Sequence, residues 1–199
     1  MIELDAPGVP AGADVVTSVP IAQPVSCTGP VAPALGAPIA PEESRLGFSA
    51  TQAGTSFEGA FRRFTAEVRF DAADLSSSRA VVVIEMAGAE TDNLERDAAL
   101  QGSDWFAVSR YPQARFETRR FRSLGNDCFE ADADLTMRDV TRPVTVPFTL
   151  RPVADGVRAL GEVTIDRSAW GVGQGQWASE QWIRHAVTVR FDLLATPLP

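Results

Sequence analysis

Apolar and polar residues alternate along most of the chain after residue 44. In residues 129–137 every second side chain is apolar, and acidic residues or threonine occupy the positions between them. Residues 144–151, 157–165 and 187–193 largely repeat this alternation. Because successive side chains of a β-strand point to opposite faces of a sheet, the period predicts four strands that each bury one face.

Four earlier segments show the same signal less regularly. They are residues 46–50, 64–70, 80–86 and 114–118, of which 80–86 is almost wholly apolar. The apolar positions of residues 57–61 are out of phase with Phe64, which predicts a bulge or bend near Arg62-Arg63. The pattern as a whole therefore predicts about eight antiparallel strands.

Turn-forming residues separate the predicted strands. They lie at Asp71–Ser78, Gly125–Asp127, Arg138–Pro143 and Asp155–Gly156. A helix is expected only at residues 94–100, where Asp92 and Glu95 resemble a capping box and Gly102 follows the last apolar residue. A further turn is expected at Ser103–Phe106. These pieces lie between two strands, where they would cover one end of a closed sheet.

Proline divides the chain into two parts. Eight of the 14 prolines fall before residue 44, and the first 43 residues show no sustained period of a strand or a helix. Because proline removes backbone donors, residues 1–43 are expected to be an extended or disordered lead-in. A tether or a partner-binding strand is the alternative for this segment. Residues 44–197 are expected to form a single β-barrel domain.

The interior of such a barrel is the candidate site. A sheet closed by about eight strands is just wide enough to be filled by side chains or to hold a slim ligand. Small residues occupy mid-strand positions at Ala50, Ala66, Ala131, Ala133, Ala159 and Gly161. Short side chains there leave volume for an apolar guest. The alternative is that long rings fill the space, namely those of Phe48, Phe64, Phe70, Phe116 and Phe148.

Composition and charge narrow the classes of partner. The formal net charge of -8 disfavours nucleic acid, and no apolar run is long enough for a transmembrane helix. Cys27 and Cys128 lack the spacing of a zinc or redox motif, and their pairing stays open. No signal peptide is visible at the N-terminus. Either the protein stays inside the cell, or its start was lost or processed.

Residues that could carry catalysis are scarce. His185 is the sole histidine, which is too few for a histidine-rich metal site, no G-x-S-x-G elbow marks a nucleophilic serine, and the carboxylates of the strands alternate with apolar residues toward solvent. The glycine-rich stretch Gly171–Trp177 lacks the lysine of a phosphate loop and is expected at a barrel rim. Trp170, Trp177 and Trp182 would line a ligand mouth, pack as core, or stack on a sugar. We expect no catalytic residue and no metal site.

Several ordered motifs resemble the YceI-like family of lipid- and polyisoprenoid-binding proteins, from about Ser44 to Ala195. The motifs are Ser44–Phe48 with Gly54 and Phe57–Phe61, Arg96-Asp97 with Asp104–Phe106, Pro112–Phe116, Leu135–Val144 and Arg167–Gly173. The resemblance implies a lipocalin-like antiparallel barrel, usually exported to the periplasm, that holds an isoprenoid chain such as that of a quinone. Many members have histidine where this chain has Gln52, and most have glycine where Asp139 stands. The Gln52 form resembles a subgroup associated with membrane cytochrome b561.

The expectation is therefore an all-β fold, a single lipocalin-like antiparallel β-barrel of about eight strands with one or two short helices. Its function would be non-enzymatic binding of an isoprenoid quinone or polyprenyl lipid for carriage, storage or sequestration. A filled barrel that acts as a protein-interaction module, or a small lipid-modifying enzyme, is the alternative. The expected lining residues are Phe48, Ala50, Phe64, Ala66, Phe70, Trp105, Phe106, Phe116, Ala131, Ala133, Leu135, Phe148, Ala159, Gly161 and Trp170.

Overall fold

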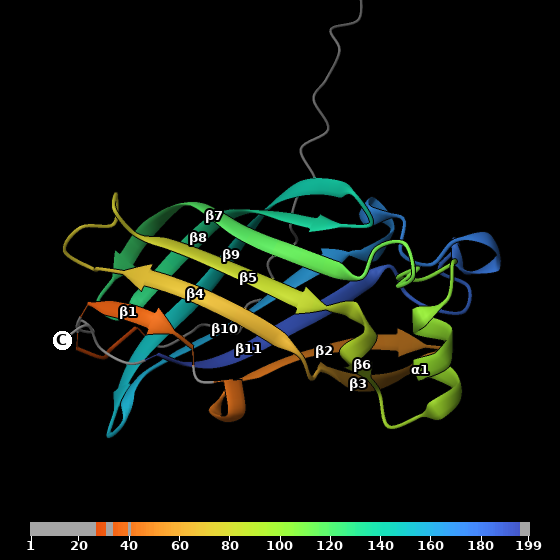
Figure 1. Ribbon diagram of the computed structural model, residues 1–199, viewed down its shortest axis with the longest axis horizontal. Coiled ribbons are helices and arrows are strands. Elements are labelled where there is room, and N and C mark those ends of the chain that lie inside the picture. The colour runs from red at the N-terminus through yellow and green to blue at the C-terminus, as the bar shows by residue number, and fades with distance from the viewer. Residues whose placement is uncertain (1–26, 31–33, 40, 196–199) are drawn as a thin grey trace, which may run out of the picture.

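The protein folds as one curled antiparallel sheet with a few short helices (Figure 1). The computed structural model describes residues 27–30, 34–39 and 41–195. Within these residues the sheet has eleven strands, in the order β1-β4-β5-β7-β8-β9-β10-β11-β2-β3-β6. The strands are β1 (Leu35–Pro38), β2 (Arg45–Gln52), β3 (Thr55–Phe61), β4 (Phe64–Phe70), β5 (Arg79–Glu85), β6 (Ala89–Glu90), β7 (Gln113–Gly125), β8 (Cys128–Met137), β9 (Val140–Val153), β10 (Gly156–Asp166) and β11 (Ala186–Ala195).

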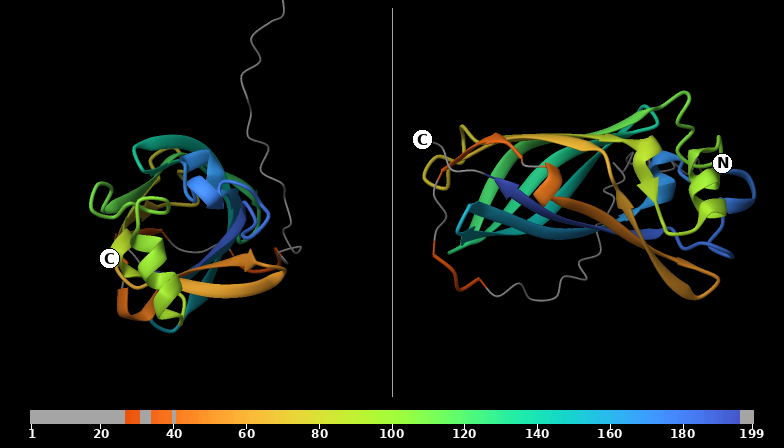
Figure 2. Two further views of the ribbon diagram at one scale, coloured as in Figure 1. Left: turned by 90° about the vertical axis from the view of Figure 1, so that its right-hand side faces the viewer. Right: turned by 60° about the horizontal axis from the view of Figure 1, so that its bottom comes forward.

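The sheet curls around a common axis, as Figure 2 shows from the α1 end. β5 continues through the one-turn helix η2 (Met86–Gly88) into β6, and β6 pairs with β3 at the other side of the sheet. Arg62, just after β3, donates its backbone N–H to Gly88 O at 2.9 Å. The two sides of the curled sheet are therefore joined near α1 (Leu94–Gln101).

The predicted all-β class is confirmed, and the strand count is higher than expected. The additional strands β1, β3 and β6 are short or flank a bend, so their sequences carry little alternation. The bend expected near Arg62-Arg63 separates β3 from β4, and the two strands pair with different partners. β3 joins β2 and β6, while β4 joins β1 and β5.

Helical structure is short and lies between strands. Besides η2 and α1, the one-turn helices are η1 (Pro41–Glu43), η3 (Arg167–Trp170) and η4 (Gly175–Trp177). α1 lies at one end of the molecule (Figure 1), as expected for a cover. Its N-cap is Asn93 rather than the predicted Asp92, because Asn93 Oδ1 accepts from Arg96 N at 2.9 Å. Among the described residues no helix is long and apolar enough to span a membrane.

The N-terminal segment contributes to the sheet before the expected domain boundary at residue 44. β1 pairs with β4 along four residues, and Ile39 N donates to Ala66 O at 3.1 Å. β1 is an edge strand, where a proline such as Pro38 is tolerated. Cys27 forms a disulfide with Cys128 at the start of β8. Residues 1–26 of the expected lead-in lie outside the described residues.

The turn after β8 is tighter than expected. It consists of two residues, Arg138 and Asp139, with φ angles of 50° and 58°, and β9 begins at Val140. Positive φ at both central positions is the geometry of a type I′ hairpin turn. Aspartate tolerates this left-handed conformation better than most residues, which fits Asp139 at the second central position of the turn.

Candidate functional site

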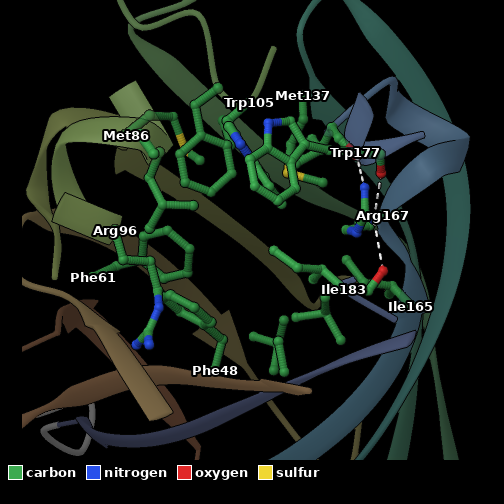
Figure 3. Close-up of a pocket in the computed structure, with 18 of the residues that line it drawn as sticks. Phe48, Phe61, Met86, Arg96, Trp105, Met137, Ile165, Arg167, Trp177 and Ile183 are labelled. Atoms are coloured by element: carbon green, nitrogen blue, oxygen red, sulfur yellow. Dashed lines mark hydrogen bonds between the residues drawn. The ribbon is translucent and has the colours of Figure 1, made fainter. Parts of the chain in front are cut away.

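A cavity lies inside the curled sheet under α1. Its volume is about 360 Å³, within the range of small-molecule pockets. Figure 3 shows Phe48, Phe61, Trp105 and Ile183 around it. We call it the upper cavity. Its apolar lining consists of Phe48, Ala50, Phe57, Phe61, Ile84, Met86, Ala99, Leu100, Trp105, Phe106, Ala114, Leu135, Met137, Ile165, Val172, Trp177, Ile183, Val187 and Val189.

The upper cavity opens to solvent between α1 and the β2–β3 hairpin. Asn93, Glu95 and Ala99 line it and are exposed, whereas the wall on the opposite strands is buried or half-buried. Gln52 at the end of β2 and Arg96 on α1 also line it. The polar lining residues on α1 and the hairpin thus gather at this mouth.

A second cavity of about 160 Å³ continues toward the other end of the molecule. None of its lining residues is exposed, and all are apolar except Thr118. The Thr118 hydroxyl accepts from Ala80 N at 2.8 Å and donates to Ala80 O at 3.3 Å, so its hydrogen bonds are made within the sheet. We call this the lower cavity.

Four residues line both cavities, each from a different strand. They are Ile84 of β5, Leu135 of β8, Ile165 of β10 and Val189 of β11. We call them the waist. The two cavities therefore adjoin at the waist, and the walls of both are mainly apolar.

Aromatic rings close the end beyond the lower cavity. Phe70 packs against Phe121 and Phe129 with ring centroids 5.1 and 5.0 Å apart, and Phe148 packs against Phe129 at 5.7 Å. At this end the interior is filled by rings, as one of the two expectations held. In the remainder of the interior there is open volume, as the other expectation held. Leu35 and Ile39 from the N-terminal segment cover the same end, since both are buried and line the lower cavity.

Arg167 is a buried cation in the wall of the upper cavity. It is 3% exposed and donates five hydrogen bonds to backbone carbonyls of the loop after η3. The acceptors are the carbonyl oxygens of Val172, Gly173, Trp177, Ile183 and Arg184, and Figure 3 shows two of these bonds. Burial lowers the pKa of this guanidinium. Arg167 therefore holds the glycine-rich loop against the barrel.

Two buried side-chain nitrogens lack a hydrogen-bond partner within the described residues, Arg96 Nε and Trp105 Nε1. Both belong to residues that line the upper cavity. The Arg96 guanidinium carbon lies 3.9 Å from the centroid of the Phe57 ring, and Arg96 makes no ion pair in the described chain. Buried donors without partners are rare in folded proteins.

Eleven of the fifteen expected lining residues lie on the two cavities. Phe48, Ala50, Trp105, Phe106 and Leu135 line the upper cavity, and Phe64, Phe70, Phe116, Leu135, Ala131, Phe148 and Ala159 line the lower cavity.

Ala66, Ala133, Gly161 and Trp170 line neither cavity. Gly161 is covered by the Phe191 ring, because a Cβ there would lie 2.5 Å from Phe191 Cζ. Trp170 is core, 2% exposed, and its indole N–H donates to Leu135 O at 2.9 Å. Ala66 and Ala133 are buried in the packed wall.

Much of the upper cavity's lining was missed by the alternation. Ala99 and Leu100 come from α1, and Trp177 and Ile183 come from the loop after η3, where no period of two exists. The sequence feature that pointed to this part of the lining was the set of tryptophans around the glycine-rich stretch. Of these, Trp177 lines the cavity, whereas Trp182 is 52% exposed.

Most acidic residues of the strands form ion pairs with arginines. Asp134 accepts from Arg119 Nε at 2.6 Å, and this hydrogen bond holds the pKa of the carboxyl below its usual value. Hydrogen bonds from Arg79 and Arg115 do the same for the pKa of Glu117. His185 is half-buried and its Nε2 lies 2.9 Å from Ala178 O. No cluster of potential metal ligands is found among the described residues.

The profile of the YceI-like domain matches residues 38–195. The chain belongs to this family. A UPF0312 protein of Azotobacter vinelandii is 33% identical over 88 residues, and one of Vibrio parahaemolyticus is 28% identical over 102 residues. These alignments cover 44% and 51% of this chain and 46% and 54% of the relatives. The chain thus spans about half the length of the curated relatives it matches.

Solved structures of the family share the fold. Burkholderia cenocepacia BcnA superposes with a TM-score of 0.77 at 29% identity, covering 79% of this chain and 99% of BcnA. A polyisoprenoid binding domain from Saccharophagus degradans gives 0.64 at 15% identity, covering 82% and 99%. A YceI protein from Campylobacter jejuni gives 0.62 at 19% identity, covering 72% and 87%. The curled antiparallel sheet is therefore that of YceI-like and polyisoprenoid-binding domains.

Proposed function

We propose that this protein binds an isoprenoid lipid, either a polyprenyl chain or an isoprenoid quinone, inside its curled sheet. The observation that carries the proposal is the pair of adjoining apolar cavities inside the curled sheet. A cavity of about 360 Å³ opens beside α1 and shares four wall residues with an apolar cavity of about 160 Å³. This shape suits a guest with a wide end near the mouth and a slim tail beyond the waist.

The energetics of such a guest follow from its hydrocarbon content. Burial of a methylene contributes about 0.8 kcal/mol, so a five-carbon isoprene unit contributes roughly 3 to 4 kcal/mol before ordering costs. The lower cavity offers no hydrogen-bonding group apart from Thr118, which is already bonded to Ala80. A polar guest would lose its hydration there without compensation. An apolar tail is the chemistry that this interior favours.

The relatives support the proposal at the level of the fold. The domain from Saccharophagus degradans is a polyisoprenoid binding domain and has the same curled sheet. We extend that class of guest to this chain because its own interior is apolar and open, and no step of the proposal requires catalysis. Carriage, storage and sequestration all follow from such binding.

An exported location and a membrane partner belong to the same proposal. Disulfides persist in oxidising compartments such as the periplasm, and this chain carries one between Cys27 and Cys128. A membrane cytochrome that exchanges quinone would be a suitable partner. This last element rests on the resemblance of the Gln52 form alone.

The test is lipid extraction followed by titration. Protein purified from an oxidising compartment is extracted with organic solvent, and mass spectrometry is expected to find a prenylated species. A prenylated benzoquinone is then titrated while tryptophan fluorescence is followed, since Trp105 and Trp177 lie in the wall with ring centroids 5.8 Å apart. An empty extract together with no response to added quinone would refute the proposal.

Ala50→Phe tests whether the guest occupies the upper cavity, because Ala50 lies on the wall of this cavity and is 7% exposed. A ring there displaces several methylenes of the guest, so affinity is expected to fall about tenfold or more. Ala98→Phe, the same change at an exposed α1 position outside the cavity, is the control. Ala50→Val gives a graded version if the larger ring prevents folding. Unchanged affinity in a folded Ala50 variant would place the guest elsewhere.

A further inference from the structure

The three tryptophans around the glycine-rich stretch have three different positions in the fold. Trp170 is core and Trp177 lines the upper cavity, whereas Trp182 is 52% exposed. Within the described residues no second ring and no guanidinium packs on the Trp182 ring. Neither the core nor the upper cavity accounts for this side chain, and an exposed large apolar group often marks a binding surface.

The backbone on both sides of Trp182 is held in place. Trp182 O accepts from Ala53 N at 2.7 Å, and Arg184 N donates to Thr51 O at 3.0 Å. Between these two hydrogen bonds, Gln52 and Ile183 form an isolated antiparallel bridge. The exposed ring is therefore carried by backbone that is anchored to the end of β2.

Trp182 points away from the upper cavity. Ile183 is 7% exposed and points into that cavity, as Figure 3 shows, and Gln52 opposite it lines the same cavity. Because successive side chains of an extended segment point to opposite faces, the side chains of Trp182 and Thr51 lie on the outer face. They line a pocket there of about 310 Å³, which we call the outer groove. Its other lining residues are Ala53, Gly54, Glu180, Gln181 and Arg184.

The outer groove combines one aromatic ring with a hydroxyl, an amide and an ion pair. The side chains of Thr51 and Gln181 make no hydrogen bond with other described residues, so both can donate to a ligand and accept from it. Glu180 Oε2 lies 3.7 Å from Arg184 Nη1, so the charges of the lining balance. A Cβ at Gly54 would meet no atom within 4 Å, which leaves the groove open at the tip of the β2–β3 hairpin.

This combination fits a sugar ring better than a hydrocarbon or an anion. The C–H face of a pyranose packs on an aromatic ring, because the face of the ring carries partial negative charge. Hydroxyls at the edge of the sugar donate and accept, which matches the groups of Thr51 and Gln181. A hydrocarbon would remove these groups from water without compensation, and an anion would meet the carboxylate of Glu180.

We propose that the outer groove is a binding site for a neutral saccharide, with the Trp182 ring as the surface on which the sugar stacks and Gln181 as a polar partner. This site goes beyond the proposed lipid binding and does not depend on it, because the outer groove and the upper cavity lie on opposite faces of the same wall. A saccharide and a lipid would bind to the chain independently.

The experiment titrates the full chain with two neutral oligosaccharides, cellohexaose and chitohexaose, and follows the indole N–H resonances by NMR. The Trp182 resonance is identified by its absence from the spectrum of Trp182→Phe. It is expected to shift until the site is saturated, while the resonances of Trp105, Trp170 and Trp177 stay in place.

Two substitutions test the stacking ring and the polar partner, with affinity measured from backbone amide shifts. Trp182→Ala is expected to bind the saccharide about tenfold more weakly or worse, as loss of stacking on an aromatic ring typically gives, and Trp182→Phe to fall between. Gln181→Ala is expected to bind about fivefold more weakly through the lost hydrogen bond. Gln176→Ala, at an exposed glutamine of η4 outside the groove, is the control and should keep the wild-type affinity.

The outcomes separate the saccharide from other ligands. A Trp182 resonance that neither oligosaccharide moves at millimolar concentration would overturn the site. Tighter binding of an anionic oligogalacturonate would overturn the neutral class of ligand. Trp182-dependent binding to phosphatidylcholine vesicles without any response to the saccharides would assign the ring to a membrane surface instead.

Discussion

At the scale of single residues, Arg167 shows how a charge can serve a structural purpose beside an apolar cavity. The side chain is 3% exposed, and its partners are carbonyl oxygens rather than a carboxylate. Burying an ionised group is unfavourable unless its hydrogen bonds are satisfied. The five N–H groups of the Arg167 guanidinium donate to five backbone carbonyls of one loop. These hydrogen bonds both compensate the buried charge and hold the loop in place.

Replacing this side chain should therefore release the loop. Arg167→Met leaves buried carbonyls without donors, and the expected loss of unfolding free energy is about 3 to 5 kcal/mol. Urea denaturation measures the loss, and limited proteolysis should show new cleavage between residues 171 and 185. Arg184→Met is the control, because Arg184 is exposed and its ion pair with Glu180 spans 3.7 Å. Equal stability of the two variants would contradict this account.

Individual residues also show how far sequence patterns reach. Alternation correctly placed Phe48, Ala131 and Phe148 on the inner face, because a strand allows only two directions for a side chain. It could not show that the Phe191 ring lies over Gly161. Such contacts depend on the register between β10 and β11, which a single strand's pattern does not contain.

At the scale of elements, the waist is made by four strands that each contribute one branched aliphatic side chain. Ile84, Leu135, Ile165 and Val189 each line both the upper and the lower cavity. The four positions are far apart in sequence. Strand positions were predictable from the sequence, but the meeting of these four was not, because it depends on the curl of the sheet and the stagger of its strands.

The waist gives a prediction about tail length. Val189→Phe should block passage to the lower cavity, so affinity in a series of prenylated quinones should stop increasing at a shorter tail than in the wild type. Each isoprene unit excluded from the interior forfeits up to roughly 3 to 4 kcal/mol of burial. Affinity measured across the series tests this, with Thr188→Phe, which lines neither cavity on the same strand, as the control. Parallel curves for Val189→Phe and the wild type would show that tails do not pass the waist.

The elements that alternation could not describe are those that complete the site. α1 was predicted from its capping residues and the glycine that follows it, and its position as a cover was inferred, yet its contribution of Ala99, Leu100 and Arg96 to the cavity has no counterpart in a strand pattern. The mouth depends on the relative position of α1 and the β2–β3 hairpin in the fold, which no pattern within a single strand or helix contains.

At the scale of the whole molecule, the N-terminal segment fastens one end of the sheet. The Cys27–Cys128 disulfide links positions 101 residues apart, and Gly29 N donates to Asp127 Oδ1 at 3.0 Å beside it. From there the chain leads to β1, whose Leu35 is 1% exposed. High proline content thus did not prevent this part of the segment from joining the core.

Removal of the disulfide should destabilise the whole barrel. A cross-link over a loop of this length typically contributes about 2 to 4 kcal/mol, so Cys27→Ser with Cys128→Ser should lower the unfolding free energy by that amount. Denaturation of the wild type with and without a dithiol reductant should reproduce the difference. The double variant has no disulfide to reduce, so its free energy of unfolding is expected to be the same with and without the reductant. A wild type indifferent to reductant would show that the bond adds nothing to stability.

The ring cluster of Phe70, Phe121, Phe129 and Phe148 has a consequence for exchange. In the described part of the chain these rings pack against one another at the end of the lower cavity away from α1, so a guest that enters tail first beside α1 would also leave beside α1. A lipid of the proposed kind would then enter and leave through the same mouth of the upper cavity. The part of the lipid that enters last would be the first part that a receiving partner contacts. Hand-over would begin at the head while the tail is still sheltered from water.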